Sequence, residues 1–137
     1  GGKITLPLGA LYHGTKFAVE GISEALHYEV EEFGGQVKII EPGIIATEFT
    51  GSSFDFSNDE SMAEYQELVA KMTNTISQSY QNASLPSMVA DVIFEAATDN
   101  KKQLRYSAGE DAKMLIENRK KYDDETFFMG LKSQFGL

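Results

Sequence analysis

Tyr12 and Lys16 are the side chains whose types and spacing could perform acid–base chemistry. Residues four apart on a helix lie on one face, so the phenol and the ammonium would be neighbours. A phenol has a pKa of about 10, and a nearby cation lowers it. A tyrosine tuned in this way can donate a proton to a developing alkoxide or remove one from an alcohol. The pair taken alone also fits, more simply, an amphipathic helix with a half-exposed tyrosine and a solvated lysine.

A second candidate site is the segment EPGIIAT, residues 41–47. A strand that runs into Pro42-Gly43 presents backbone amides at its carboxyl end, which is where ligands bind in open α/β sheets. Thr47 adds a hydroxyl that could hydrogen-bond to a phosphate or an amide. The alternative is an ordinary turn that ends a strand.

Helices and strands alternate around these residues. Two strands joined through helices are normally parallel, and parallel sheets are normally larger than two strands and covered on both faces. The sequence therefore predicts an α/β chain that forms part of a doubly wound sheet, whose missing central strands would lie ahead of Gly1. The apolar spacing and the β-branched runs predict helices over 9–33, 58–81, 86–98 and 112–121, strands over 36–41 and 103–107, and a tail over 122–137.

Three capping signals mark the predicted helix starts. Ser57–Glu60 and Ser61–Glu64 both match a capping box, and Asp111 stands where it could cap the last predicted helix. Gly34 and Gly35 predict the end of the first helix, because glycine adopts the conformation that commonly terminates helices.

Composition excludes several classes of function. The 137 residues contain 42% hydrophobic and 24% charged side chains, as expected for one globular domain. The net charge of −9 would repel a phosphate backbone, and no apolar run reaches the roughly 18 residues of a membrane span, so neither nucleic acid nor membrane is an expected partner. Without cysteine, and with only His13 and His27 as histidines, no metal site is expected. A cytoplasmic location is expected.

Taken together, the two candidate sites resemble the classical short-chain dehydrogenase/reductase family. The family signature is Tyr-x-x-x-Lys at the start of a long helix, then a strand, then Pro-Gly-x-x-x-Thr. Here the sequence is YHGTK from Tyr12, followed by VKIIEPGIIATEF, and the later RYSAGEDA is similar to the family's last strand and turn. The resemblance covers about residues 1–121. It implies a partial Rossmann-like fold and an oxidoreductase that interconverts a small-molecule alcohol and a carbonyl with NAD or NADP.

The resemblance also implies roles for individual residues. Tyr12 would be the catalytic acid–base, and Lys16 would bind the nicotinamide ribose hydroxyls and lower the pKa of Tyr12. Backbone groups of Ile45 would hold the nicotinamide carboxamide, and Thr47 would bond to the carboxamide or the pyrophosphate. The cofactor-binding set is completed by Pro42 and Gly43, which would shape the turn under the nicotinamide ring.

The sequence departs from the family by what it does not contain. The family's catalytic serine and its Gly-rich dinucleotide loop precede the tyrosine, and the 137 residues contain no Gly-x-x-x-Gly-x-Gly. We therefore expect residues 1–137 to be the C-terminal portion of one NAD(P)-binding domain, inactive without the N-terminal half of that domain. Two alternatives are a truncated chain that serves only as an assembly or binding module, and an acidic helical interaction domain unrelated to dehydrogenases.

Two further regions follow from the resemblance. Residues 46–81 correspond to the substrate lid, in which Phe49, Phe54 and Phe56 would either cover a substrate or pack permanently into the core. The 9–33 helix corresponds to the subunit-contact helix, which predicts a homodimer or homotetramer. Neither the substrate nor the choice between NAD and NADP is encoded in these motifs.

Overall fold

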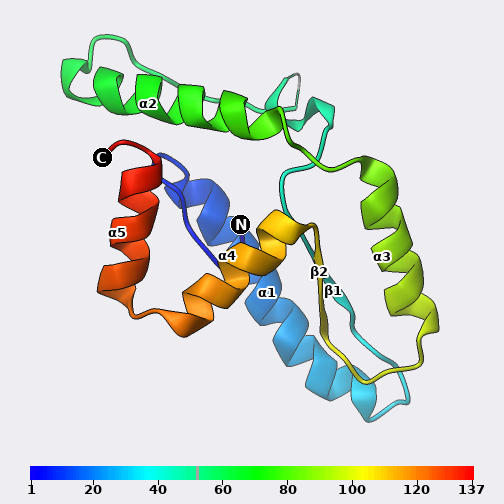
Figure 1. Ribbon diagram of the computed structural model, residues 1–137. Helices are drawn as coiled ribbons and strands as arrows, with labels where there is room; N and C mark the ends of the chain where they lie inside the picture. Colours follow the sequence, from blue (N-terminus) through cyan, green and yellow to red (C-terminus); the bar gives the residue numbers. More distant parts are fainter. Residues whose placement is uncertain (52) are drawn as a thin grey trace.

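The computed structural model describes residues 1–51 and 53–137, in which five α-helices accompany two strands (Figure 1). The predicted α/β class is confirmed, as a partial Rossmann-like arrangement. The predicted lid includes Ser52, which lies outside the described residues. The elements in order are α1 (Ala10–Glu31), β1 (Ile39–Pro42), the short 3-10 helix η1 (Glu48–Thr50), α2 (Ala63–Tyr80), α3 (Pro86–Thr98), β2 (Arg105–Ala108), α4 (Glu110–Lys121) and α5 (Asp124–Gln134).

The two strands pair in parallel, as predicted. The register runs from Ile39 opposite Arg105 to Pro42 opposite Ala108, and α2 and α3 form the crossover between them. Strand β1 begins three residues later than predicted. Just ahead of it, the ammonium of Lys38 donates to the backbone carbonyls of Lys101 and Gln103, which joins the two strand entries.

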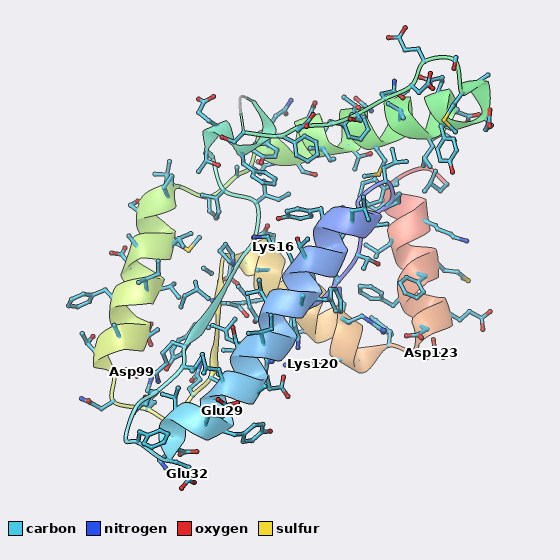
Figure 2. All side chains as sticks on the ribbon, turned by 180° about the vertical axis from the view of Figure 1, so that it is seen from behind. Lys16, Glu29, Glu32, Asp99, Lys120 and Asp123 are labelled. Atoms are coloured by element: carbon cyan, nitrogen blue, oxygen red, sulfur yellow. The ribbon has the colours of Figure 1, made fainter. Side chains whose placement is uncertain are left out.

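The strand pair lies between α3 and α1 (Figures 1 and 2). On one side, α3 lies close to β2, and each element has a small buried residue, Ala96 on α3 and Ala108 on β2. On the other side the link is ionic, because Arg105 of β2 lies 3.0 Å from Glu20 and 2.6 Å from Glu24 of α1. Helix α2 lies at the edge of the molecule, away from both strands (Figure 1).

Helix α1 ends at the glycine pair that the sequence singled out. Gly34 has a φ of 76° and donates its N–H to the Glu31 carbonyl at 3.0 Å, and Gly35 donates to Val30 at 3.0 Å. These bonds satisfy carbonyls that a helix end would otherwise leave free, and the positive φ at Gly34 favours glycine there.

The predicted capping boxes at Ser57–Glu60 and Ser61–Glu64 are wrong. Helix α2 starts at Ala63 and carries no side-chain cap. The carboxylate of Asp59 instead accepts the Ser61 N–H at 3.0 Å and the Ser61 hydroxyl at 2.6 Å. A local turn around the Asp59 side chain thus competes successfully with capping.

The predicted tail 122–137 is also wrong, because it contains α5. Asp123 caps this helix by accepting the Thr126 N–H at 2.8 Å. The apolar spacing of Phe127, Leu131 and Phe135 places three buried side chains on one face. Within the described residues, none of the helices is both long enough and apolar enough to cross a membrane.

Candidate active site

Tyr12 and Lys16 lie one turn apart near the start of α1, as their spacing predicts. The Lys16 ammonium nitrogen lies 5.6 Å from the centre of the Tyr12 ring. The Thr15 hydroxyl donates to the Tyr12 carbonyl at 2.7 Å. Figure 2 shows Lys16 on the N-terminal part of α1, far from Glu29 and Glu32 at the other end of the helix.

The pKa of Tyr12 moves in the opposite direction from the one expected. Partial burial of the phenol raises the pKa, and the nearby Tyr80 hydroxyl raises it further. Both effects disfavour the phenolate. Burial does so because it removes water from the charged form. Lys16 faces the ring of Tyr12 and is not among the causes of the shift. In this structure Tyr12 is therefore a protonated phenol at neutral pH.

His13 is buried and holds the N-terminal segment onto α1. Its Nε2 accepts the Leu6 N–H at 3.0 Å, and its Nδ1 lies 2.9 Å from the Gly1 carbonyl oxygen. Because the Leu6 N–H can only donate, Nε2 carries no proton and Nδ1–H is the donor to Gly1. Both ring nitrogens are thus occupied by backbone groups.

The turn after β1 is held by partners from three distant places. Four consecutive residues, 43–46, leave the strand, and three of their N–H groups are used within the chain. Ile45 is the exception: its N–H has no partner among the described residues. The three bonds run from Gly43 to the Ala108 carbonyl (2.9 Å), from Ile44 to the Asp111 carboxylate (2.7 Å) and from Ala46 to the Ser84 carbonyl (2.9 Å).

Thr47 lies at the exposed end of this turn. Its hydroxyl oxygen accepts the Phe49 N–H at 3.3 Å and so caps η1. The hydroxyl proton has only a long contact, 3.5 Å, to the Ile45 carbonyl. Thr47 can therefore donate this proton to a ligand at little cost, because the existing contact is at the limit of a hydrogen bond.

An aromatic row joins Tyr12 to the segment that follows Thr47. The ring centres are 5.8 Å apart for Tyr12 and Phe49, 5.7 Å for Phe49 and Phe54, and 5.9 Å for Phe54 and Phe56. Each phenylalanine is about two fifths exposed, at 39%, 40% and 41%. Such half-covered rings do not form a closed core within the described chain.

Two residues that hold the turn could not be recognised from the sequence. Asp111 was predicted to cap a helix, but α4 begins after Gly109 and the Asp111 carboxylate bonds to Ile44 instead. Ser84 lies between the predicted helices 58–81 and 86–98, yet its backbone pairs with Ile44 and Ala46. Nothing in the local sequence around either residue indicates these long-range partners.

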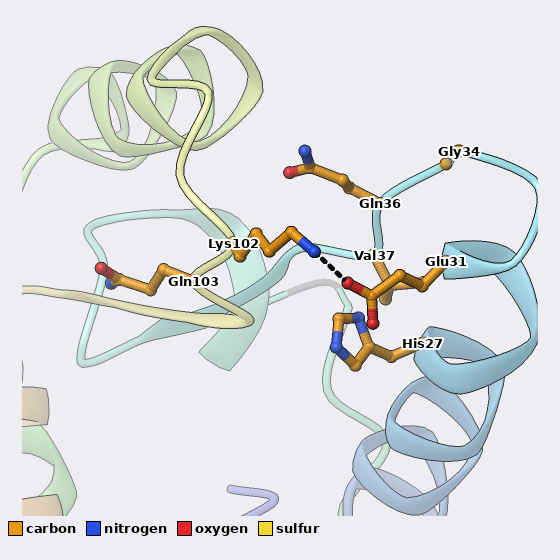
Figure 3. Close-up of a pocket in the computed structure, with 8 residues that line it drawn as sticks. His27, Glu31, Gly34, Gln36, Val37, Lys102 and Gln103 are labelled. Carbon is orange, nitrogen blue, oxygen red and sulfur yellow. Dashed lines mark hydrogen bonds and ion pairs between the residues drawn. The ribbon is translucent and has the colours of Figure 1, made fainter.

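A shallow pocket of about 130 Å³ lies at the opposite end of α1 from Tyr12. The Lys102 ammonium pairs with the Glu31 carboxylate at 2.7 Å across it, beside His27 (Figure 3). This ion pair links the end of α1 to the residues just before β2. It does not adjoin the Tyr12–Lys16 pair.

Known proteins are similar to this chain in sequence. The family described as short chain dehydrogenase matches residues 1–58. An uncharacterized oxidoreductase of Schizosaccharomyces pombe is 44% identical over all 137 residues, which make up 57% of that protein. The chain belongs to the short-chain dehydrogenase family.

More distant relatives are also oxidoreductases. The 17-beta-hydroxysteroid dehydrogenase type 6 of Mus musculus is 32% identical over 126 residues, covering 84% of the chain and 39% of that protein. The NADPH-dependent 3-dehydrocapnine reductase of Ornithobacterium rhinotracheale is 33% identical over 106 residues, covering 77% and 37%. The chain thus spans 57% or less of the length of these relatives.

Proposed function

We propose that Tyr12 and Lys16 are the catalytic pair of an NAD(P)-dependent oxidoreductase that interconverts a small-molecule alcohol and a carbonyl. The observation that carries the proposal is the position of the Tyr12 ring. One side faces the Lys16 ammonium, and the ring also packs on Phe49, directly after the turn of residues 43–47. The contact with Phe49 supports a site formed by Tyr12, Lys16 and the turn of residues 43–47.

The residues of the turn fit the nicotinamide end of a dinucleotide. The Ile45 N–H, which has no partner in the described part of the chain, suits the carboxamide oxygen. The Thr47 hydroxyl suits the carboxamide or the pyrophosphate. Pro42 and Gly43 would shape the turn that carries these donors. When bound, NAD or NADP would supply or accept the hydride.

The protein's own part in the reaction is the movement of a proton. In reduction, the Tyr12 hydroxyl would donate its proton to the oxygen of the carbonyl as negative charge develops there. The phenol carries this proton at neutral pH, and its raised pKa makes it a weaker acid than a free tyrosine. In oxidation the Tyr12 oxygen would receive the proton of the alcohol as the phenolate, the form that burial disfavours. Lys16 would hold the ribose hydroxyls.

The aromatic row supports an apolar substrate. Phe49, Phe54 and Phe56 continue outward from the Tyr12 ring and are half exposed, so an apolar body whose reactive oxygen reaches Tyr12 would cover them. The hydroxysteroid for which the mouse relative is named has this character. Residues 46–81 would then form the substrate lid.

We further propose that residues 1–137 form the C-terminal portion of a single cytoplasmic NAD(P)-binding domain. The shares of 57%, 39% and 37% that the chain covers in its relatives support a longer parent. The second candidate is a non-catalytic assembly module. It is favoured by the lack of a Gly-x-x-x-Gly-x-Gly loop in the sequence.

Exchange of Tyr12 for Phe in the full-length parent tests the proposal. Tyr12→Phe removes only the proton donor, so carbonyl reduction should fall by roughly 10²- to 10⁴-fold while the affinity for NADH or NADPH changes little. Lys16→Ala should lower both the rate of carbonyl reduction and the affinity for the cofactor, because the same ammonium would bind the ribose and act beside Tyr12. Turnover with an apolar ketone and calorimetric cofactor titration are the measurements.

Tyr28→Phe is the matched control, since Tyr28 lies on the same helix and is exposed. It should leave rate and affinity unchanged. Retention by Tyr12→Phe of more than about a tenth of the wild-type rate would rule out Tyr12 as the general acid. A wild-type parent that binds neither dinucleotide would instead favour the assembly module.

A further inference from the structure

We propose that Asp111 is a positioning residue for the cofactor: it holds the turn after β1 in the conformation that turns the Ile45 amide toward the nicotinamide carboxamide. The inference rests on the proposed function and extends it to a residue on a different element. Asp111 belongs to the first turn of α4, 67 residues from the peptide that it binds. It contacts no reacting atom itself.

The first argument is the hydrogen bond. The Asp111 Oδ2 atom accepts the Ile44 N–H at 2.7 Å, a short distance typical of a bond to an ionised group. A carboxylate in the first turn of a helix ordinarily serves the amides and the dipole of its own helix. Here the carboxylate points away from α4 and toward the end of β1.

The second argument is the space left for the carboxylate. A Cβ atom on Gly43 would lie 2.1 and 2.2 Å from the two Asp111 oxygens, and one on Gly109 would lie 2.5 Å from Oδ1. Gly109 also has a φ of 110°, which disfavours other residues. Glycines at both positions therefore permit the carboxylate to lie directly against the turn.

The third argument is the direction of the neighbouring peptides. The Gly43 N–H continues the pairing with β2, and the Ala46 N–H bonds to the Ser84 carbonyl. With Ile44 fixed by Asp111, the Ile45 N–H is left between two anchored amides and without a partner among the described residues. A preorganised donor of this kind binds a ligand without first having to be ordered.

Substitution of Asp111 in the full-length protein tests the inference. Asp111→Ala should raise the dissociation constant for NADH and NADPH by roughly tenfold or more, because it removes a charge-assisted bond and frees the turn. Asp111→Asn keeps an acceptor oxygen for the Ile44 N–H and should recover most of the affinity. Calorimetric titration measures both. Hydrogen exchange without cofactor should show faster exchange at residues 44–46 in Asp111→Ala than in the wild type.

Glu110→Ala is the matched control. Glu110 occupies the same helical turn, but its carboxylate pairs with the exposed Lys113 at 2.7 Å, so its loss should change neither the affinity nor the exchange. Unchanged cofactor affinity in Asp111→Ala, beside normal wild-type binding, would overturn the inference alone. The inference would also be overturned if thermal unfolding showed that Asp111→Ala is partly unfolded and this unfolded fraction alone accounted for the weaker binding. Failure of the wild-type protein to bind either dinucleotide would overturn the proposed function, and this inference with it.

Discussion

Asp99 and Tyr106 show how a single hydrogen bond joins the end of α3 to β2. The Tyr106 hydroxyl donates to the Asp99 carboxylate at 2.7 Å, and the Lys38 ammonium lies 3.8 Å from the same carboxylate. The bond from Tyr106 is the main cause of the lowered pKa of Asp99. Burial, followed by the same bond to Asp99, raises the pKa of Tyr106 to about 12.

These shifts predict how stability depends on pH. A carboxyl whose pKa is lowered by folding stabilises the fold above its unfolded pKa of about 4, and this contribution is lost as pH falls through the folded value. Asp99→Asn should therefore lower the thermal unfolding midpoint at pH 7, and the gap from wild type should close below about pH 4. Glu60→Gln, at an exposed site, is the control. A gap that stayed constant with pH would contradict a charge effect.

At the residue scale, the sequence could predict pairs that are close in the chain but not partners that are distant. Spacing alone places Lys16 beside Tyr12. The direction of the Tyr12 pKa shift could not be predicted, because it depends on burial and on Tyr80, both products of the tertiary structure. Asp111 was mistaken for a helix cap for the same reason, since Ile44 lies far away in the sequence.

At the element scale, apolar periodicity predicted α1 and α3, and the helices between the two strands predicted their parallel pairing. Pro86 begins α3 as expected, because its missing N–H costs nothing at the first helical position. Helix α5 was missed although Asp123 and an acidic first turn precede its apolar face.

We expect the segment between β1 and α2 to close over a bound substrate. Residues 58–62 are tied to α2 by the Gln66 amide, which donates to the carbonyls of Asp59 at 3.0 Å and Met62 at 3.1 Å. In the preceding part, Phe49 and Phe54 are half exposed. We expect fast hydrogen exchange over the described residues of 46–62 in the free protein, and protection with NADP and an apolar ketone bound.

Helix α3 is the internal control for this experiment, because it packs on both strands and should exchange slowly in either state. Slow exchange of 46–62 in the free protein would mean that the phenylalanines are permanent core, and would remove the argument for a lid.

At the scale of the whole molecule, α1 turns its acidic side inward and an apolar stripe outward. Glu20 and Glu24 pair with Arg105 of β2. The apolar stripe consists of Val19, Ile22 and Leu26, which follow one another at three- and four-residue steps and are exposed. The sequence predicted this helix but could not decide which face is covered, because that depends on neighbours outside the two strands.

We propose that a second copy of the protein covers this stripe, in a homodimer or homotetramer. Ile22→Lys should convert the full-length protein to monomers, since a buried charge at the centre of an apolar contact is strongly unfavourable. Tyr28→Lys is a closely matched control, because both side chains are 67% exposed but Tyr28 lies on another face of α1. Light scattering measures the mass of each variant. A wild-type protein that is already monomeric, or an Ile22→Lys protein with the wild-type mass, would contradict the proposal that a second copy covers the stripe.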